Sequence, residues 1–411
     1  GYSAQADDHM TYPKLTAVYL PGAINAIVAG ENPAEHFRQI ENELLAVTGG
    51  YLHRLNGMYY LVGGHRFDGR YNPMNNPTFS QEYTNALRIF DIEDDGANLS
   101  VAMVDTWIDE AAFHRRDYNV AAQIMPDGSE GLTAFSGVFQ PTTDLPYLNA
   151  VNITADDYAV QADFAQYFNH YHCAHISLYD EAQNEMHTVF FGGIAQYYMD
   201  GETLVQDDNV PFVNTIARVT RTADGSMAEY KLPTEMPGLL GSGSEFIPVP
   251  GISSFSNGVI KLNDLEADSV LVGYIVGGIH SSAPNIFWTN NGTQSEAHST
   301  VFKVYLTANN TLSNDQLNEL SNNAMGLQVY PNPSDGRLNI SFNLKSPDDV
   351  FIQVMDLNGR VVVRESRQEG LSIGKNELTL QSDQLSAGVY ILSIRTGNGM
   401  SATQRIVLNA R

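Results

Sequence analysis

The chain has 411 residues, with 47 acidic against 22 basic side chains, and its formal net charge at pH 7 is −25. Nucleic acids and anionic membrane surfaces are held by clustered Lys and Arg, so this charge balance excludes both classes of partner. The sequence has no run of 18 apolar residues, which predicts no membrane insertion, and its single cysteine, Cys173, excludes an internal disulfide.

Residues 1–310 are expected to be all-β. Short runs rich in Tyr, Phe, Gly and β-branched residues follow one another, and turn signals separate them. The best helix candidate is Pro33 to Val47, which is equally compatible with a strand. Leu15 to Leu20 and Phe37 to Ile40 are interpreted as outer strands of a partial unit that begins at Gly1 to Ala4.

A strand that ends in small residues recurs four times along this region, at Tyr59–Gly64, Thr133–Gly137, Val189–Gly193 and Tyr274–Gly278. One strand is predicted before each of them, at Gly50–Leu55, Tyr118–Ile124, Cys173–Tyr179 and Glu245–Val249. Two are predicted after each, at Ala86–Ile92 with Leu99–Trp107, Leu148–Ile153 with Tyr158–Phe164, Thr215–Thr220 with Met227–Leu232, and Thr300–Leu306 with a weaker partner near Leu312. The pattern therefore predicts four successive units of four antiparallel strands.

Repeated four-stranded units are typical of β-propeller blades. The strand that ends in Gly-Gly resembles kelch repeats, most clearly from Gly49-Gly50-Tyr51 to Gly63-Gly64. We attribute the paired glycines to crowding, because small residues let the inner strands approach a common axis. The resemblance implies a parent ring of roughly six blades, of which four full blades and part of another lie here. The alternative is a ring of roughly five blades that the N-terminal residues complete.

The C-terminal region has a different pattern. Residues 311–326 are polar and Asn-rich, and we expect a linker there. From Leu327 to Arg411, runs of alternating apolar and polar residues are separated by Asp335-Gly336, Asn358-Gly359 and Gly397-Asn398-Gly399, which favour tight hairpins. The sequence therefore predicts a small antiparallel β-sandwich over residues 327–411.

Several spaced motifs in this tail resemble one family, the type A C-terminal sorting domain of the Bacteroidetes type IX secretion system. They are Tyr330-Pro331-Asn332-Pro333 with Gly336, the turn from Asp356 to Gly359, the run Leu385 to Tyr390, and a last strand bearing Arg405. The resemblance implies export across the outer membrane by the type IX secretion machinery to the cell surface or exterior. Because Gly1-Tyr2-Ser3 is not a signal peptide, we expect further residues before it. A generic appended sandwich is the alternative.

Propeller topology places the loop after each second strand and the link before each first strand on the same side of the disc. We therefore expect a ligand site formed by residues at these positions: His65, Arg66, Gln140, Gln196, Tyr197 and His280 after second strands, and Arg115, Arg116, His170, His172 and Glu245 before first strands. Arginine pairs suit carboxylates and phosphates, so a polar or anionic ligand, carbohydrate or protein, is predicted. The alternative is that Arg115 and Asp117 form a structural network between blades.

Metal binding and catalysis have weaker signals. In a strand, His170 and His172 would share one face, which supplies half of a metal site, while Cys173 and His175 would point the other way. No third ligand is fixed by the sequence, so neither a metal nor a cofactor is predicted. The first hypothesis is a binding module. The alternative is a kelch-propeller enzyme that acts on sugars, such as an epimerase, a glycan-processing enzyme or a copper oxidase, although Glu245 and Asp117 are the only obvious acids near the site.

Overall fold

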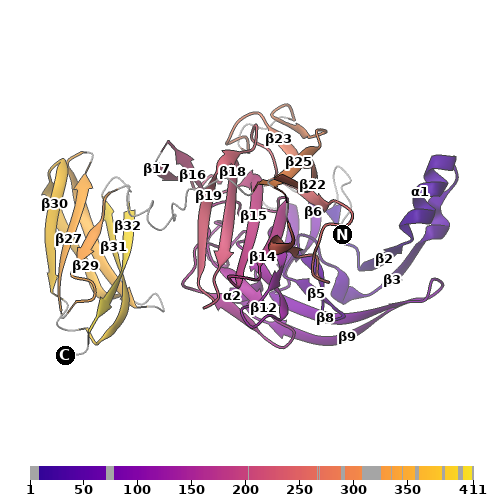
Figure 1. Cartoon of the computed structure of the whole chain (residues 1–411), viewed down its shortest axis with the longest axis horizontal. Helices are drawn as coiled ribbons and strands as arrows, with labels where there is room; N and C mark the ends of the chain where they lie inside the picture. Colours follow the sequence, from indigo (N-terminus) through magenta and orange to yellow (C-terminus); the bar gives the residue numbers. More distant parts are fainter. Residues whose placement is uncertain are drawn as a thin grey trace. The chain divides into compact units, whose positions relative to one another are not determined.

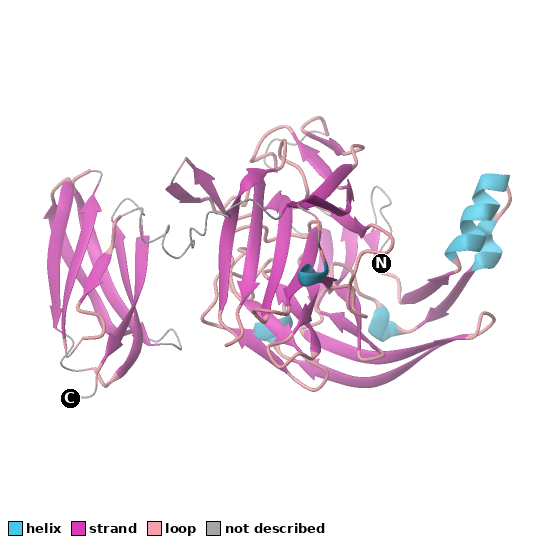
Figure 2. Ribbon diagram, viewed as in Figure 1, coloured by secondary structure: helices cyan, strands magenta, loops and turns pink. Residues whose placement is uncertain are grey.

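The computed structural model describes residues 9–70, 78–201, 203–265, 267, 269–287, 292–307, 325–334, 336–344, 346–356, 361–381, 385–396 and 401–409. The chain divides into two compact units, residues 1–196 with 207–312 and residues 197–206 with 313–411. Both units consist mainly of β-strands, which confirms the all-β prediction (Figure 2). No helix within the described ranges is long and apolar enough to cross a membrane.

Four antiparallel sheets follow one another along the first unit (Figure 1). The first sheet contains β4 (Tyr51–Leu55), β5 (Met58–Val62), β8 (Ala86–Asp94) and β9 (Leu99–Ile108). The second contains β10 (Asn119–Ile124), β11 (Glu130–Phe135), β12 (Ala150–Ile153) and β13 (Tyr158–Gln161). The third contains β14 (His175–Asp180), β15 (Glu185–Ile194), β18 (Phe212–Arg221) and β19 (Met227–Glu235), with β21 (Ile260–Lys261) parallel to β14. The fourth contains β20 (Ser244–Pro248), β22 (Ser269–Gly277) and β25 (Phe302–Thr307).

These sheets occupy the four predicted repeat units. Within each sheet the antiparallel strands pair in sequence order, and in the third sheet β21 is added in parallel on the free side of β14. The first strands of consecutive sheets are neighbours, with β10 beside β4, β14 beside β10, and β20 beside β14. The fourth sheet has three strands in the described ranges, because the predicted partner near Leu312 lies outside them. Strand pairing between described residues does not close the four sheets into a ring.

Three short sheets are formed mainly by segments of the chain between the second and third strands of the first, third and fourth sheets. They are formed by β6 (His65–Arg70) and β7 (Thr78–Tyr83) with β1 (His9–Met10), by β16 (Tyr197–Asp200) with β17 (Thr203–Gln206), and by β23 (Ile279–Ser281) with β24 (Ser295–Ala297). The second of these hairpins is grouped with the second compact unit. A single helical turn, α2 (Glu110–Phe113), precedes the second sheet, and η3 (Leu262–Asp264) follows β21.

The N-terminal part of the first unit contains an arm. Here β2 (Lys14–Val18) pairs with β3 (Phe37–Glu41), and the helix α1 (Leu20–Ala29), which follows β2 in the chain, lies at the far end of this strand pair (Figure 1). The two predicted strands are therefore paired, whereas the predicted partial unit at Gly1 to Ala4 lies outside the described residues.

The helix prediction is wrong, because 33–47 contains η1 (Pro33–His36), β3 and η2 (Glu43–Leu45) instead of a helix. The helix begins earlier, with Pro21 in its first turn, and it ends at Gly30, whose φ of 73° forms a left-handed cap. Proline at a helix start and glycine just beyond its end are the sequence signals that identify this helix.

The glycine pair at the end of β15 shows why small residues recur there. Gly192 and Gly193 have φ values of 65° and 97°, a region that other residues rarely adopt. A Cβ atom on Gly192 would lie 2.0 Å from the carbonyl oxygen of Leu240, and Gly193 N donates to that same oxygen at 2.8 Å. The two glycines therefore turn the chain, and this turn allows Gly193 N to bond to the segment that precedes the fourth sheet.

The tail folds as two antiparallel sheets. One contains β26 (Gln328–Tyr330), β27 (Arg337–Leu344) and β30 (Gly374–Gln381), and the other contains β28 (Asp348–Asp356), β29 (Val361–Leu371), β31 (Gly388–Thr396) and β32 (Ser401–Leu408). Both contribute to one hydrophobic core, which includes Phe342 of β27 and Leu392 of β31. The predicted turn residues Asp335, 358–359 and 397–399, and positions 311–324 of the predicted linker, lie outside the described residues.

The proline-containing motif of the tail is bound to its last strand. Val407 N donates to Asn332 Oδ1 at 2.8 Å, and Ser334 N donates to the carbonyl oxygen of Val407 at 2.8 Å. In the run before β31, the Tyr390 hydroxyl donates to the carbonyl oxygen of Ser386 at 3.0 Å. The proline-containing motif therefore joins segments that are far apart in the sequence, whereas the Tyr390 contact is local.

Candidate functional site

A relay of backbone hydrogen bonds connects the links that precede the four first strands. Asp117 N donates to Gly49 O at 2.9 Å, His172 N donates to Asp117 O at 3.0 Å, and Gly243 N donates to His172 O at 2.8 Å. Each residue lies shortly before the first strand of its own sheet. The relay therefore brings four distant segments of the chain to one place, as the sequence predicted for these links.

Five side chains from these segments form a group that we call the link cluster: Tyr51, Arg116, Asp117, His172 and Glu245. His172 Nε2 lies 3.0 Å from Glu245 Oε1, and the His172 ring stacks on Tyr51 with centroids 6.1 Å apart. Arg116 Nη1 donates to Asp117 Oδ2 at 3.0 Å. The side chains of Glu245 and His172 keep 65% and 28% of their surface accessible, so a ligand can reach the cluster.

The two carboxyl groups of the link cluster have opposite pKa shifts. The hydrogen bond with His172 lowers the pKa of Glu245. Burial raises the pKa of Asp117, although the charges of Arg116 and His172 oppose this effect. Burial also raises the pKa of Tyr51 to about 12, so its hydroxyl stays protonated at neutral pH.

Arg116 is positioned by three neighbours. Its Nε donates to the Tyr83 hydroxyl at 3.2 Å, and its guanidinium lies 4.5 Å from the centre of the Phe139 ring. Phe139 has a φ of 63°, which is unusual for a bulky residue and indicates a backbone held in place by its surroundings. Arg116 Nη2 makes no hydrogen bond within the described part of the chain, so this donor remains for a ligand.

Arg115 and Arg66 lie elsewhere. Arg115 is fully buried, and its guanidinium donates to Ala112 O, Ser136 O and the backbone and side-chain oxygens of Asn149. Arg115 is therefore part of a structural network, as in the alternative, but the network differs from the predicted one. Its partners are oxygens of α2 and the second sheet, whereas Asp117 accepts from Arg116. Arg66 lies at the surface of β6, where it pairs with Glu43 and Asp68 at 3.0 Å each.

The other predicted histidines do not join the link cluster. His170 is buried, its Nε2 lies 2.8 Å from Gln166 O, and its Nδ1 accepts from Gln196 N at 3.0 Å. His65 is buried on β6, and burial lowers its pKa to about 3. His280 lies on β23 and contacts Glu296 Oε1 at 3.1 Å.

The premise of the two-histidine metal site is wrong, because His170 and His172 precede β14 and are not in a strand. Both ring nitrogens of His170 are engaged with the backbone, so neither offers a lone pair to a metal. Among the described residues, no three His, Cys, Asp or Glu side chains are arranged to hold a metal ion. Cys173 is buried, which raises the pKa of its thiol to about 12.

Three predicted polar residues follow second strands. Gln140 donates through Nε2 to Pro146 O at 2.8 Å, and the buried Gln196 donates to Asp208 Oδ1 at 2.7 Å. Tyr197 begins the β16–β17 hairpin. Tyr51 was not among the predicted site residues. It directly follows Gly49-Gly50, where the link enters the first strand of the first sheet, and this position is the signal that could have identified it.

The comparison with protein families concerns the tail. Residues 328–409 match the family described as a secretion system C-terminal sorting domain. The tail is a sorting domain. This confirms that the protein is secreted to the cell surface or exterior, and it implies an interaction with the type IX secretion machinery.

The other two comparisons concern the chain as a whole. No curated protein matches it. A solved structure with some similarity is the crystal structure of dimeric latent PorU from Porphyromonas gingivalis, which is 11% identical with a TM-score of 0.18 and covers 95% of this chain. The chain spans only 37% of that structure, well under two thirds, and so low a TM-score carries no argument about fold or function.

Proposed function

We propose that this exported protein is a binding module whose residues 1–310 form a kelch-like β-propeller and whose residues 327–411 form a sorting β-sandwich after a linker at 311–326. The ligand is polar and binds at the link cluster, with a carbohydrate as the first candidate. The observation that carries this proposal is the backbone relay, which gathers accessible polar side chains from three links and β4 at one place. Consecutive antiparallel sheets with neighbouring first strands support the propeller.

The chemistry of the link cluster suits a sugar. Glu245 is an acceptor for hydroxyl groups, Arg116 Nη2 is a donor, and the stacked rings of Tyr51 and His172 add an aromatic surface beside them. Sites for small molecules combine an apolar or aromatic surface with a few placed polar groups in this way. The cluster holds both signs of charge, so it does not demand a strongly anionic ligand.

A glycan array probed with the full chain tests this proposal. Any glycan that binds should lose at least about tenfold in affinity in Arg116→Ala and in Glu245→Gln, because each removes a charged hydrogen-bonding partner. Arg66→Ala is the matched control, since this arginine is paired at the surface outside the link cluster, and its affinity should be unchanged. Equal binding by all variants, or no binding glycan at all, would contradict the proposal.

An enzyme that processes glycans is the second candidate, and one observation favours it. Asp117 and Glu245 both lie near His172, yet their pKa values shift in opposite directions, as happens for an acid and a base that act on a glycosidic bond. The expected result is turnover of a bound glycan that Asp117→Asn abolishes while binding persists. Binding without any change of the glycan, measured by mass spectrometry, decides for the binding module.

A further inference from the structure

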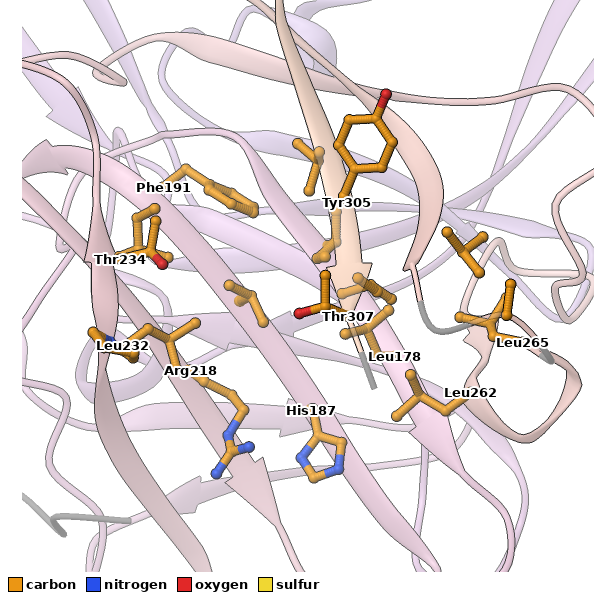
Figure 3. A pocket seen from close by; sticks show the side chains of 18 residues that line it. Leu178, His187, Phe191, Arg218, Leu232, Thr234, Leu262, Leu265, Tyr305 and Thr307 are labelled. Carbon is orange, nitrogen blue, oxygen red and sulfur yellow. The ribbon is translucent and has the colours of Figure 1, made fainter. Parts of the chain in front are cut away.

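A second cavity lies in the first unit, away from the link cluster. It has a volume of about 450 Å³ and lies between one face of the third sheet and the fourth sheet (Figure 3). Val189 and Phe191 alternate along β15, so both point to this face, and Val304 and Leu306 line the opposite wall from β25. Most of the wall is therefore apolar.

One end of this cavity is polar. Arg218 and His187 lie together there, away from Phe191 and Tyr305 (Figure 3). The guanidinium of Arg218 lies 4.8 Å from the centre of the Tyr230 ring, but it forms no hydrogen bond or ion pair with any described residue. Its Nε is buried without a partner.

The lack of a partner for Arg218 is unusual in this chain, which has 47 acidic and 22 basic residues. Arg221, on the same strand, is more deeply buried than the half-buried Arg218, yet its guanidinium donates to Gln123 Oε1 and Ile124 O. A buried N–H group without an acceptor has lost hydration and has gained no hydrogen bond in exchange, and this is the state of Arg218 Nε. Burial accordingly lowers the pKa of Arg218. An anion in the cavity would restore the missing interaction.

His187 cannot supply a second positive charge at neutral pH. Burial and the charge of Arg218 lower its pKa to about 4, and its Nδ1 lies 2.9 Å from Thr220 Oγ1. Arg218 is the charged residue that lines this end of the cavity. Glu185, which lies 3.8 Å from His187 Nε2 and whose charge raises the pKa of Arg218, is not among the lining residues. One anionic group inside the cavity can therefore pair with Arg218, and the remaining length of the cavity matches a hydrocarbon chain.

We propose that this cavity binds an amphipathic organic anion, a fatty-acid-like carboxylate whose hydrocarbon chain lies along the apolar walls and whose carboxylate pairs with Arg218. The volume falls within the range of about 300–1,000 Å³ that is typical of small-molecule sites. This site is independent of the link cluster, because the two share no residue.

Calorimetric titration of the full chain with laurate, below its micelle concentration, tests the proposal. Laurate should bind the unmodified protein, and Arg218→Met should weaken it by at least about tenfold, because a charged hydrogen bond is lost while the side-chain volume is kept. Dodecanol has the same hydrocarbon length without the charge, so it should bind weakly and equally to both proteins. Arg54→Met is the matched control, since Arg54 is exposed and lies outside the cavity, 5.9 Å from the Tyr59 ring centre.

A second variant tests the apolar part of the cavity independently of the charge of Arg218. Val189→Phe fills the apolar part opposite β25, and it should abolish the binding of laurate while Arg218 is retained. A laurate affinity that is unchanged in Arg218→Met or in Val189→Phe would overturn the proposal, as would the absence of laurate binding to the unmodified protein. If Arg218→Met fails to fold, Val189→Phe and the comparison of laurate with dodecanol on the unmodified protein still decide the question.

Discussion

Arg115→Ala should lower the free energy of unfolding of the first unit by about 3–5 kcal/mol. The Arg115 guanidinium is fully buried, and it holds together α2, the end of β11 and the segment before β12 through Ala112, Ser136 and Asn149. Its removal leaves these buried oxygens without donors and opens a space beside Tyr147, whose ring centre lies 4.1 Å from the guanidinium.

Urea unfolding followed by tryptophan fluorescence checks this prediction. Both tryptophans, at positions 107 and 288, belong to the first unit, so the signal does not report on the tail. Arg66→Ala is the control, because its ion pairs lie at the surface and should add little stability. An Arg115→Ala protein with an unchanged midpoint would show that the buried network is not needed for the fold.

Removal of residues 327–411 should leave the protein in the periplasm instead of outside the cell. The tail matches the sorting-domain family over 328–409, and it has its own hydrophobic core, whose described members all lie between Met325 and Leu408. The first unit has separate cores, so we expect it to remain folded without the tail. Cell fractionation with an antibody against the first unit measures the distribution.

Two controls make the export experiment specific. Tryptophan fluorescence of the truncated protein, recovered from the periplasm, distinguishes a trapped folded protein from a degraded one. Fusion of residues 327–411 to a periplasmic reporter should carry that reporter out of the cell. Truncated protein found in the medium at the same level as the full chain would contradict the assignment of export to the tail.

The strands were predictable because their signals are local. Alternation over β27 and the hairpin spacing of β4 and β5 depend on a few neighbouring residues, and the structure places strands there. The positions of the glycine pairs were predicted correctly, but the physical reason given for them was incomplete. Crowding was expected at Gly192 and Gly193, but their positive φ angles and their bond to Leu240 matter as much.

The site was less predictable because its chemistry depends on tertiary contacts. Arg115 and Arg116 are adjacent in the sequence, yet one is enclosed by carbonyl oxygens while the other reaches Asp117 and Phe139. No local pattern distinguishes the two side chains. The cavity at Arg218 was missed for the same reason, since it exists only where the face of the third sheet meets the fourth sheet.

The relay from Gly49 to Gly243 is made only of main-chain atoms. Exchange of the side chains of Tyr51, His172 or Glu245 would therefore leave the mutual placement of the sheets intact. The positions proposed to recognise a ligand are thus free to vary independently of those that fix the framework. Such a division lets one scaffold acquire new specificities through a few substitutions, and it makes the link cluster a suitable place for engineered libraries.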